Sequence, residues 1–218
     1  MLAAGDAIGN HVLRIQAVLR AAGYDSRVYA EEIHPGVAGR AGHYTAFAGD
    51  GRILYHLSTS CPPMADLVAG HARRHGPGAV VVDYHHITPP EFFDRWEPWA
   101  AESARRARTE MAGLAPHIGL ALADSSYSED DLRASGYTRT AVVPILIDFA
   151  GYDGPGEGAP AAGGGGGARW LFVGRVAPNK CQHDVIGAFA VYRELFDPAA
   201  TLTLVGGVTS AAYRRALG

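Results

Sequence analysis

The sequence predicts an α/β protein with an open, parallel β-sheet and helices packed on it. Apolar runs suited to buried strands recur along the 218-residue chain, and amphipathic stretches with helical spacing separate them. The run 79–84, Ala-Val-Val-Val-Asp-Tyr, is almost continuously apolar, which is typical of a parallel strand buried on both faces. Strands that alternate with helices along a chain favour parallel pairing through right-handed crossovers.

Composition and charge are those of an ordinary globular protein. Apolar residues make up 48% of the chain and charged residues 19%, and the formal net charge is −3. This charge gives no general argument for binding nucleic acid. The two cysteines, Cys61 and Cys181, form neither a disulfide framework nor a metal cluster, and no run approaches the ~20 apolar residues of a membrane span. We therefore expect a cytoplasmic protein with no nucleic-acid partner.

The predicted elements of residues 1–150 form one domain. A strand stub at 2–4 and a loop at 5–10 precede a helix that presents Val12, Ile15 and Leu19 on one face and stops at Gly23. The strands expected after this helix are 26–30, 53–57, 79–84, 119–123 and 141–145. The helices expected between them are one around 64–71, a long region at 89–116 interrupted at Pro98, and one at 128–136. Pro144 indicates either that the last strand ends near this proline or that the strand lies at an edge of the sheet.

A change in composition separates a second unit from the first. Residues 151–168 include nine glycines and no aliphatic residue larger than alanine, which predicts a flexible linker. The α/β pattern restarts in 169–218, with strands at 170–173 and 202–206 and a helix at about 181–196 between them. Two strands are too few for an independently stable sheet, so we expect 169–218 to be the start of an incomplete domain.

One candidate site lies in the second unit, where a strand runs into a glycine turn before a helix. Gly174 and Arg175 follow the apolar run 171–173, and Lys180 opens the predicted helix. Backbone N–H groups and the helix dipole favour an anion at such a turn. An arginine fork and a lysine point charge five residues apart suit a diphosphate. The alternative is an ordinary strand-to-helix connection with two solvated cations.

A second candidate site lies at the carboxyl ends of the first domain's strands, where open parallel sheets bind ligands. The segments 5–10, 55–58 and 83–88 fall there. In the last of these, His85 and His86 can present an imidazole to a polar substrate near neutral pH, although a solvated His86 also fits the pattern. No third and fourth ligand falls at a recognisable spacing, so we predict no metal site.

The segment Val-Gly-Arg-Val-Ala-Pro-Asn-Lys, residues 173–180, resembles the donor-phosphate segment of GT-B glycosyltransferases of the family 4 type. Other stretches resemble this family in order and spacing, namely the glycine-containing loop 5–10, the Tyr-His segment 84–89, the run 123–136 and the strand residues 143–144. The similarity covers most of 5–148 loosely and 170–206 more closely. It implies a GT-B architecture, in which an N-terminal Rossmann-like domain on the acceptor side precedes a second, nucleotide-sugar-binding one.

The resemblance also implies a reaction and roles for individual residues. It implies retaining transfer of a sugar from a nucleotide-diphosphate sugar to a hydroxyl of a glycan or lipid-linked acceptor, with no cofactor and no metal. Gly174, Arg175 and Lys180 match the residues that hold the donor diphosphate, and Gly5 matches a close approach of the backbone to it. His85 matches the residue that orients the donor near the reacting carbon. The candidates on the acceptor side are Asp6, Asn10 and His56.

The chain departs from the family pattern at both ends. Only residues 1–4 precede the glycine loop, and nothing in the sequence matches the family's later Glu-x7-Glu segment. We therefore expect the 218 residues alone to have little or no transferase activity. The alternatives are a non-catalytic α/β ligand-binding protein, or a relic without donor-site function. An NAD-linked enzyme is disfavoured because no Gly-x-Gly-x-x-Gly follows a strand.

Two groups of arginines bear on membrane contact. They are Arg73 with Arg74, and Arg105 with Arg106 and Arg108. Such groups are compatible with peripheral docking to an anionic membrane or lipid-linked acceptor. They are equally compatible with ordinary solvated helix faces.

Overall fold

The computed structural model describes residues 2–3, 6–147 and 166–218 and belongs to the α/β class. The chain divides into two compact units, Met1–Ile87 with Arg106–Asp153 and Thr88–Arg105 with Gly154–Gly218. Most of the predicted linker lies outside the described residues. Within the described parts of the chain, no helix combines the length and the apolar character needed to cross a membrane.

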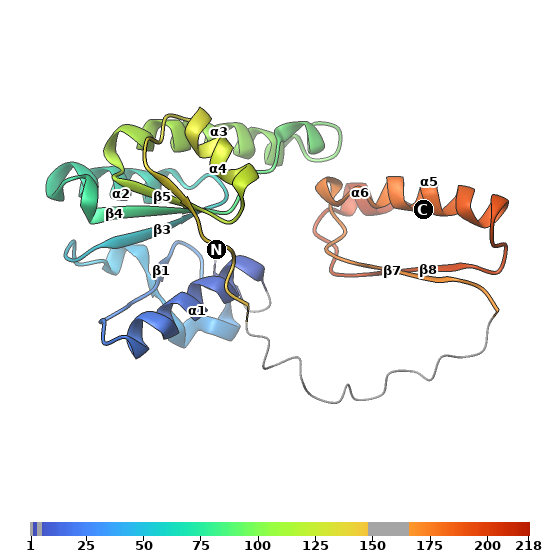
Figure 1. Cartoon of the computed structure of the whole chain (residues 1–218), viewed down its shortest axis with the longest axis horizontal. Coiled ribbons are helices and arrows are strands. Elements are labelled where there is room, and N and C mark those ends of the chain that lie inside the picture. The colour runs from blue at the N-terminus through green and yellow to red at the C-terminus, as the bar shows by residue number, and fades with distance from the viewer. Residues whose placement is uncertain (1, 4–5, 148–165) are drawn as a thin grey trace. The chain divides into compact units, whose positions relative to one another are not determined.

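A four-stranded parallel sheet forms the centre of the first unit (Figure 1). Its strands are β3 (Ile53–Leu57), β4 (Val80–Tyr84), β5 (Leu120–Ala123) and β6 (Thr140–Val142), and they pair in chain order. Four of the five residues of β4 are buried, which confirms the prediction of a strand covered on both faces. β6 lies at an edge of the sheet and ends at Val142, before Pro144, so both alternatives for the predicted strand at 141–145 hold, although the strand is shorter than expected.

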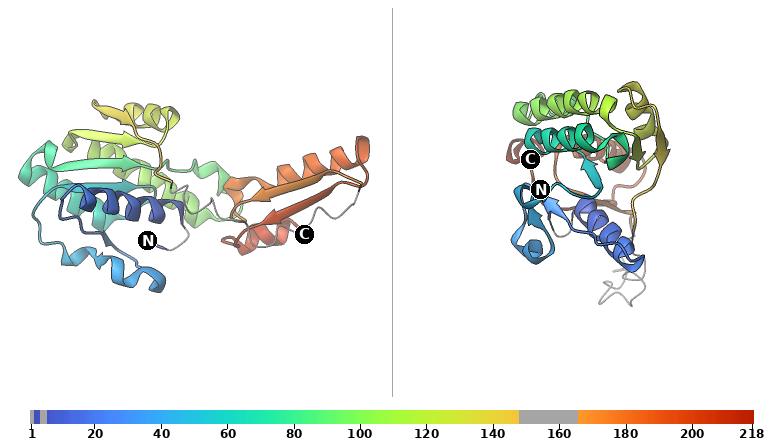
Figure 2. Two further views of the ribbon diagram at one scale, coloured as in Figure 1. Left: turned by 60° about the horizontal axis from the view of Figure 1, so that its bottom comes forward. Right: turned by 90° about the vertical axis from the view of Figure 1, so that its left-hand side faces the viewer.

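Helices cover both faces of this sheet. α2 (Pro62–His75), α3 (Pro98–Leu114) and α4 (Ser126–Ala134) connect successive strands in one direction along the sheet, so right-handed crossovers place all three on the same face. α1 (Ala7–Ala21) lies on the opposite face (Figures 1 and 2). The main core lies between the sheet and the three helices, and its fully buried members include Leu57, Val68, Val80, Val82, Ala107, Met111, Ala121 and Leu132.

Three helix starts differ from the predictions, two because of a capping residue and one because of a proline in the first turn. α1 begins inside the predicted loop, since a carboxylate oxygen of Asp6 accepts the N–H of Gly9 at 3.1 Å and caps it. Pro98 begins α3 instead of interrupting a longer helix, because proline suits the first turn, where its missing N–H costs no helical hydrogen bond. α4 begins at Ser126 because Ser125 caps it, its hydroxyl accepting the N–H of Ser128 at 3.2 Å.

The predicted strand at 26–30 is shorter than expected and lies outside the main sheet. β1 (Tyr29–Ala30) pairs in parallel with β2 (Gly42–His43). The sequence pattern predicted no strand at the position of β2. Leu2 adds an isolated parallel bridge to Ile33. A small apolar cluster supports this region, consisting of Leu2, Leu13 and Val37 with Val12, Val28, Ala30, Ile33 and Ala41. The expectation of one sheet is therefore corrected to two sheets within the first unit.

Residues 166–218 repeat the strand–helix–strand pattern on a smaller scale. β7 (Arg169–Val173) pairs in parallel with β8 (Thr201–Val205), and α5 (Gln182–Leu195) connects them. α6 (Ala211–Ala216) follows β8. This order confirms the predicted strands and helix of the second unit to within a few residues.

One face of the β7–β8 pair is covered by α5, and side chains on the other face are exposed. On one face, the ring of Trp170 packs on α5, with its centroid 5.9 Å from that of Phe189 and 4.9 Å from that of Tyr192. On the other face, Leu171 is 66% exposed and Val173 is 72% exposed. Only half of this small sheet therefore contributes to a core among the described residues.

Candidate functional site

Three histidines and one aspartate gather where β3 and β4 end. Side chains alternate along a strand, so Tyr84 faces α2–α4 while Asp83 faces the side of α1. His56 pairs in register with Asp83 and so shares its face, and His85 lies two residues beyond Asp83. His11, on α1, completes the group. We call His11, His56, Asp83 and His85 the histidine cluster.

Three imidazole nitrogens of the histidine cluster converge on one carboxylate oxygen. Oδ2 of Asp83 lies 3.2 Å from Nε2 of His11, 3.2 Å from Nδ1 of His56 and 3.6 Å from Nε2 of His85. Nδ1 of His56 and Nε2 of His85 are 2.9 Å apart, and the two rings stack with an interplanar angle of 4°. The other ring nitrogen of His11, Nδ1, accepts a hydrogen bond from the backbone N–H of Leu146 at 2.9 Å.

The histidine cluster is almost completely covered. His11 is 1% exposed, Asp83 2% and His85 7%, whereas the side chain of His56 is 16% exposed. Burial lowers the pKa of His85 to about 4, so its imidazole is neutral at pH 7. Burial opposes the ionisation of Asp83, but the hydrogen bond from His56 and the neighbouring imidazoles outweigh this effect and lower the pKa of Asp83. A neutral His85 therefore lies beside an ionised carboxylate.

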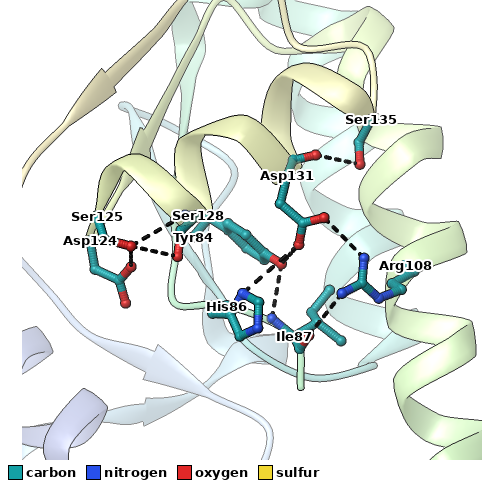
Figure 3. Close-up of polar contacts among 9 residues, drawn as sticks. All are labelled: Tyr84, His86, Ile87, Arg108, Asp124, Ser125, Ser128, Asp131 and Ser135. Atoms are coloured by element: carbon teal, nitrogen blue, oxygen red, sulfur yellow. Dashed lines mark hydrogen bonds and ion pairs between the residues drawn. The ribbon is translucent and has the colours of Figure 1, made fainter. Parts of the chain in front are cut away.

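A second polar network fixes the loop that carries His85 (Figure 3). The buried hydroxyl of Tyr84 donates to Oδ2 of Asp131 at 2.5 Å and accepts the backbone N–H of Ile87 at 2.9 Å. Arg108 donates to Oδ1 of Asp131 at 3.0 Å and to the carbonyl of Ile87 at 3.1 Å. Burial and then the hydrogen bond to Asp131 raise the pKa of Tyr84, so its hydroxyl remains a donor. These contacts attach the end of β4 to α3 and α4.

His86 occupies a conformation that few residues other than glycine adopt. Its φ is 58°, in the left-handed region, where histidine is among the better-tolerated side chains. Its ring lies 5.3 Å from that of Tyr127, and its Nδ1 is 3.9 Å from Oδ2 of Asp131. The two consecutive histidines therefore lie in different environments, since His85 belongs to the histidine cluster and His86 lies against α4.

The predicted phosphate-binding residues lie together on the turn between β7 and α5. Gly174 follows β7 directly, and its N–H donates to the carbonyl of Val205 at 2.9 Å. Arg175 and Lys180 are exposed, and neither forms an ion pair within the described parts of the chain. Lys180 ends a 3-10 turn, Pro178–Lys180, so α5 begins at Gln182, one or two residues later than predicted. The side-chain amide of Gln182 donates to the carbonyl of Arg175 at 2.7 Å and supports the turn.

The remaining predicted site residues have separate positions. Gly5 lies outside the described residues. Asp6 caps α1 and Asn10 is exposed on the same helix, so neither belongs to the histidine cluster. His56 does belong to it. The cluster also contains His11 and Asp83, which were not among the predicted site residues.

The sequence contained a pattern from which Asp83, but not His11, could have been predicted. Asp83 and His85 are two residues apart at a strand end, and the period of two places both on one face. His11 carried no such signal, because the face of α1 that meets the sheet depends on tertiary packing.

Some of the arginines considered for membrane contact have intramolecular partners. Arg108 is committed to Asp131 and Ile87, as described above. Arg105 forms an ion pair with Asp94 at 2.5 Å. These contacts account for two of the five arginines without invoking a membrane.

The comparisons with known proteins do not assign this chain, since no family model matches it and no curated protein matches it either. Its function must therefore be argued from the chemistry of its two sites. The turn after β7 presents two exposed cations beside a helix start. The histidine cluster offers three nitrogens and a carboxylate at the edge of a rigid sheet.

Proposed function

We propose that this chain contributes to a GT-B glycosyltransferase, which transfers a sugar from a nucleotide-diphosphate sugar to a hydroxyl of a glycan or lipid-linked acceptor with retention. The observation that carries the proposal is the turn between β7 and α5. There, Gly174 ends a parallel strand, and Arg175 and Lys180 lie exposed before a 14-residue helix. This is the arrangement expected of a diphosphate-binding turn.

The chemistry of glycosyl transfer explains why such a turn matters. Negative charge grows on the departing diphosphate as the bond to the sugar breaks, so preorganised donors and cations lower the barrier. The guanidinium of Arg175 can bind two phosphate oxygens at once, while the ammonium of Lys180 acts as a point charge. No protein nucleophile is needed for this contribution.

In this proposal, His85 helps to orient the donor near the reacting carbon by positioning His56, not by contacting the donor itself. Its side chain is only 1% exposed, whereas that of His56 is 16% exposed. His56 is therefore the cluster member that a ligand at this sheet edge reaches first. His85 supports it from beneath, through the contact of 2.9 Å between their ring nitrogens.

Binding of a nucleoside diphosphate tests the proposal without requiring turnover. We expect UDP or GDP to bind the 218-residue chain in isothermal titration calorimetry, and Arg175→Ala or Lys180→Ala to weaken binding at least about tenfold, since a charged hydrogen bond contributes about 1.5–3 kcal/mol. Arg193→Ala is the matched control, because Arg193 is an exposed arginine in the last turn of the same helix. It should leave the affinity unchanged.

Two results would contradict the proposal. The first is the absence of binding by every nucleoside diphosphate tested. The second is an equal loss of affinity in Arg193→Ala and Arg175→Ala, which would indicate nonspecific attraction between the protein and the anion.

A further inference from the structure

We infer that His11, His56, Asp83 and His85 form a binding site for a divalent transition-metal ion, of which Zn²⁺ fits the ligand set best. This inference does not rest on the proposed glycosyl transfer. It rests on the geometry, burial and charge of the histidine cluster, which the sequence did not predict to bind metal.

The spacing of the ligand atoms matches a tetrahedral ion. Four of the six separations between these atoms are 2.9, 3.2, 3.2 and 3.6 Å, and the two between His11 and the other histidines do not exceed 4.8 Å. Zinc bonds of about 2.0–2.2 Å in a tetrahedron place neighbouring ligand atoms about 3.3–3.6 Å apart. An ion can therefore enter once the side chains shift by up to about 1 Å to reach these separations.

The cluster is built on rigid elements rather than on a loose surface. His56 and Asp83 lie side by side on paired strands, and His11 approaches from a helix. The N–H of His85 donates to the carbonyl of Leu57 at 2.9 Å, which continues the pairing of β3 and β4 past the last residue of β4. Ligands held by such elements need little ordering when an ion binds.

Charge provides an independent argument. The carboxylate of Asp83 is 3% exposed, and all of its ion-pair partners among the described residues are histidines. A buried carboxylate needs a compensating positive charge. A divalent cation held among the carboxylate oxygen and the three imidazole nitrogens supplies that charge.

The donor atoms select the class of ion. Imidazole nitrogens with one carboxylate oxygen suit zinc and its transition-metal neighbours, whereas Mg²⁺ and Ca²⁺ prefer shells made of oxygen. Binding also makes a structural demand. An ion on Nε2 of His11 leaves the proton on Nδ1, which then cannot accept the N–H of Leu146. The proposed site and the 2.9 Å hydrogen bond from Leu146 therefore exclude each other.

The test titrates Zn²⁺ into the full chain after removal of metal by a chelator. We expect one equivalent to bind and Mg²⁺ not to compete. His56→Gln and Asp83→Asn should each weaken Zn²⁺ binding at least tenfold. The matched control is His43→Gln, because His43 is exposed and lies outside the cluster. It should bind as the wild type does.

Two further measurements use the wild-type chain, so they do not require that any variant folds. Co²⁺ should give the intense visible absorption of tetrahedral coordination, and Zn²⁺ should accelerate hydrogen exchange at the amide of Leu146. The inference is overturned if no stoichiometric Zn²⁺ binding is found, or if His43→Gln and a folded His56→Gln bind Zn²⁺ equally well. Nucleoside-diphosphate binding measured on the same samples reports separately on the proposed function.

Discussion

At the scale of single residues, the hydroxyl of Tyr84 connects the fold to the candidate site. Tyr84 is 0% exposed, and its hydroxyl binds both Asp131 on α4 and the backbone of Ile87 beyond the histidines. Tyr84 faces the side of α2–α4, and its hydroxyl fixes the loop that follows β4. His85 of this loop lies on the opposite side of the sheet, in the histidine cluster. Loss of the Tyr84 hydroxyl should therefore affect the loop after β4 without removing any atom of the histidine cluster.

We predict that Tyr84→Phe lowers the free energy of unfolding by about 1–3 kcal/mol, because it leaves the buried N–H of Ile87 without an acceptor and removes a donor from Asp131. Urea unfolding measures the loss. Tyr127→Phe is the control, since Tyr127 is 70% exposed, and it should change stability by less than about 0.5 kcal/mol. Equal effects of the two substitutions would show that the buried network adds no stability.

At the scale of elements, close backbone approach decides where β5 begins. Gly119 directly precedes β5, and its N–H donates to the carbonyl of Pro77 at 2.9 Å. A Cβ at this position would lie 2.8 Å from that carbonyl oxygen and 3.0 Å from its carbon. Only glycine allows the start of β5 and the turn before β4 to approach this closely.

We predict that Gly119→Ala destabilises the protein by about 1–3 kcal/mol, because backbone must move to accept the methyl group. Gly70→Ala is the matched control. Gly70 lies inside α2, and a Cβ there meets nothing within 4 Å, so alanine should stabilise the helix by up to about 1 kcal/mol. Thermal or urea unfolding of both variants should give changes of opposite sign. Changes of the same sign would contradict this account of Gly119.

At the scale of the whole molecule, the four-stranded sheet and the β7–β8 pair differ in how much of their surface is buried. In the first unit, four strands lie between α1 and three other helices. In 166–218, two strands have one helix-covered face and one face on which Leu171, Val173 and Val205 are 66%, 72% and 49% exposed. Two strands alone are marginally stable, so this sheet should open more readily.

Hydrogen exchange measures this difference. We predict that backbone amides of β4 and β5 exchange at least roughly a hundredfold more slowly than those of β7 and β8, because opening of the larger sheet exposes more apolar surface. Mass spectrometry of peptides from each strand resolves the two groups. Equal protection would mean that 166–218 is as well stabilised as the four-stranded sheet.

Much of the fold could be predicted from local patterns. β3 was expected at 53–57 and is found there, and β4 was expected as a doubly buried strand. The strand–turn–helix segment with Gly174, Arg175 and Lys180 is also found nearly as expected. Apolar periodicity and turn residues act over a few neighbouring positions, so the sequence carries them directly. The starts of α1 and α4 were misplaced because several nearby residues could serve as the cap, and the start of α3 because a proline can either begin a helix or interrupt one.

The sequence by itself therefore determined the α/β class, the main strands and the residues of the turn after β7. Only the tertiary structure decided the histidine cluster. His11 and Asp83 are 72 positions apart in the chain, and they meet because α1 packs on the face of the sheet that carries Asp83. No local spacing encodes that contact, since it depends on strand register and on which side of the sheet each helix covers.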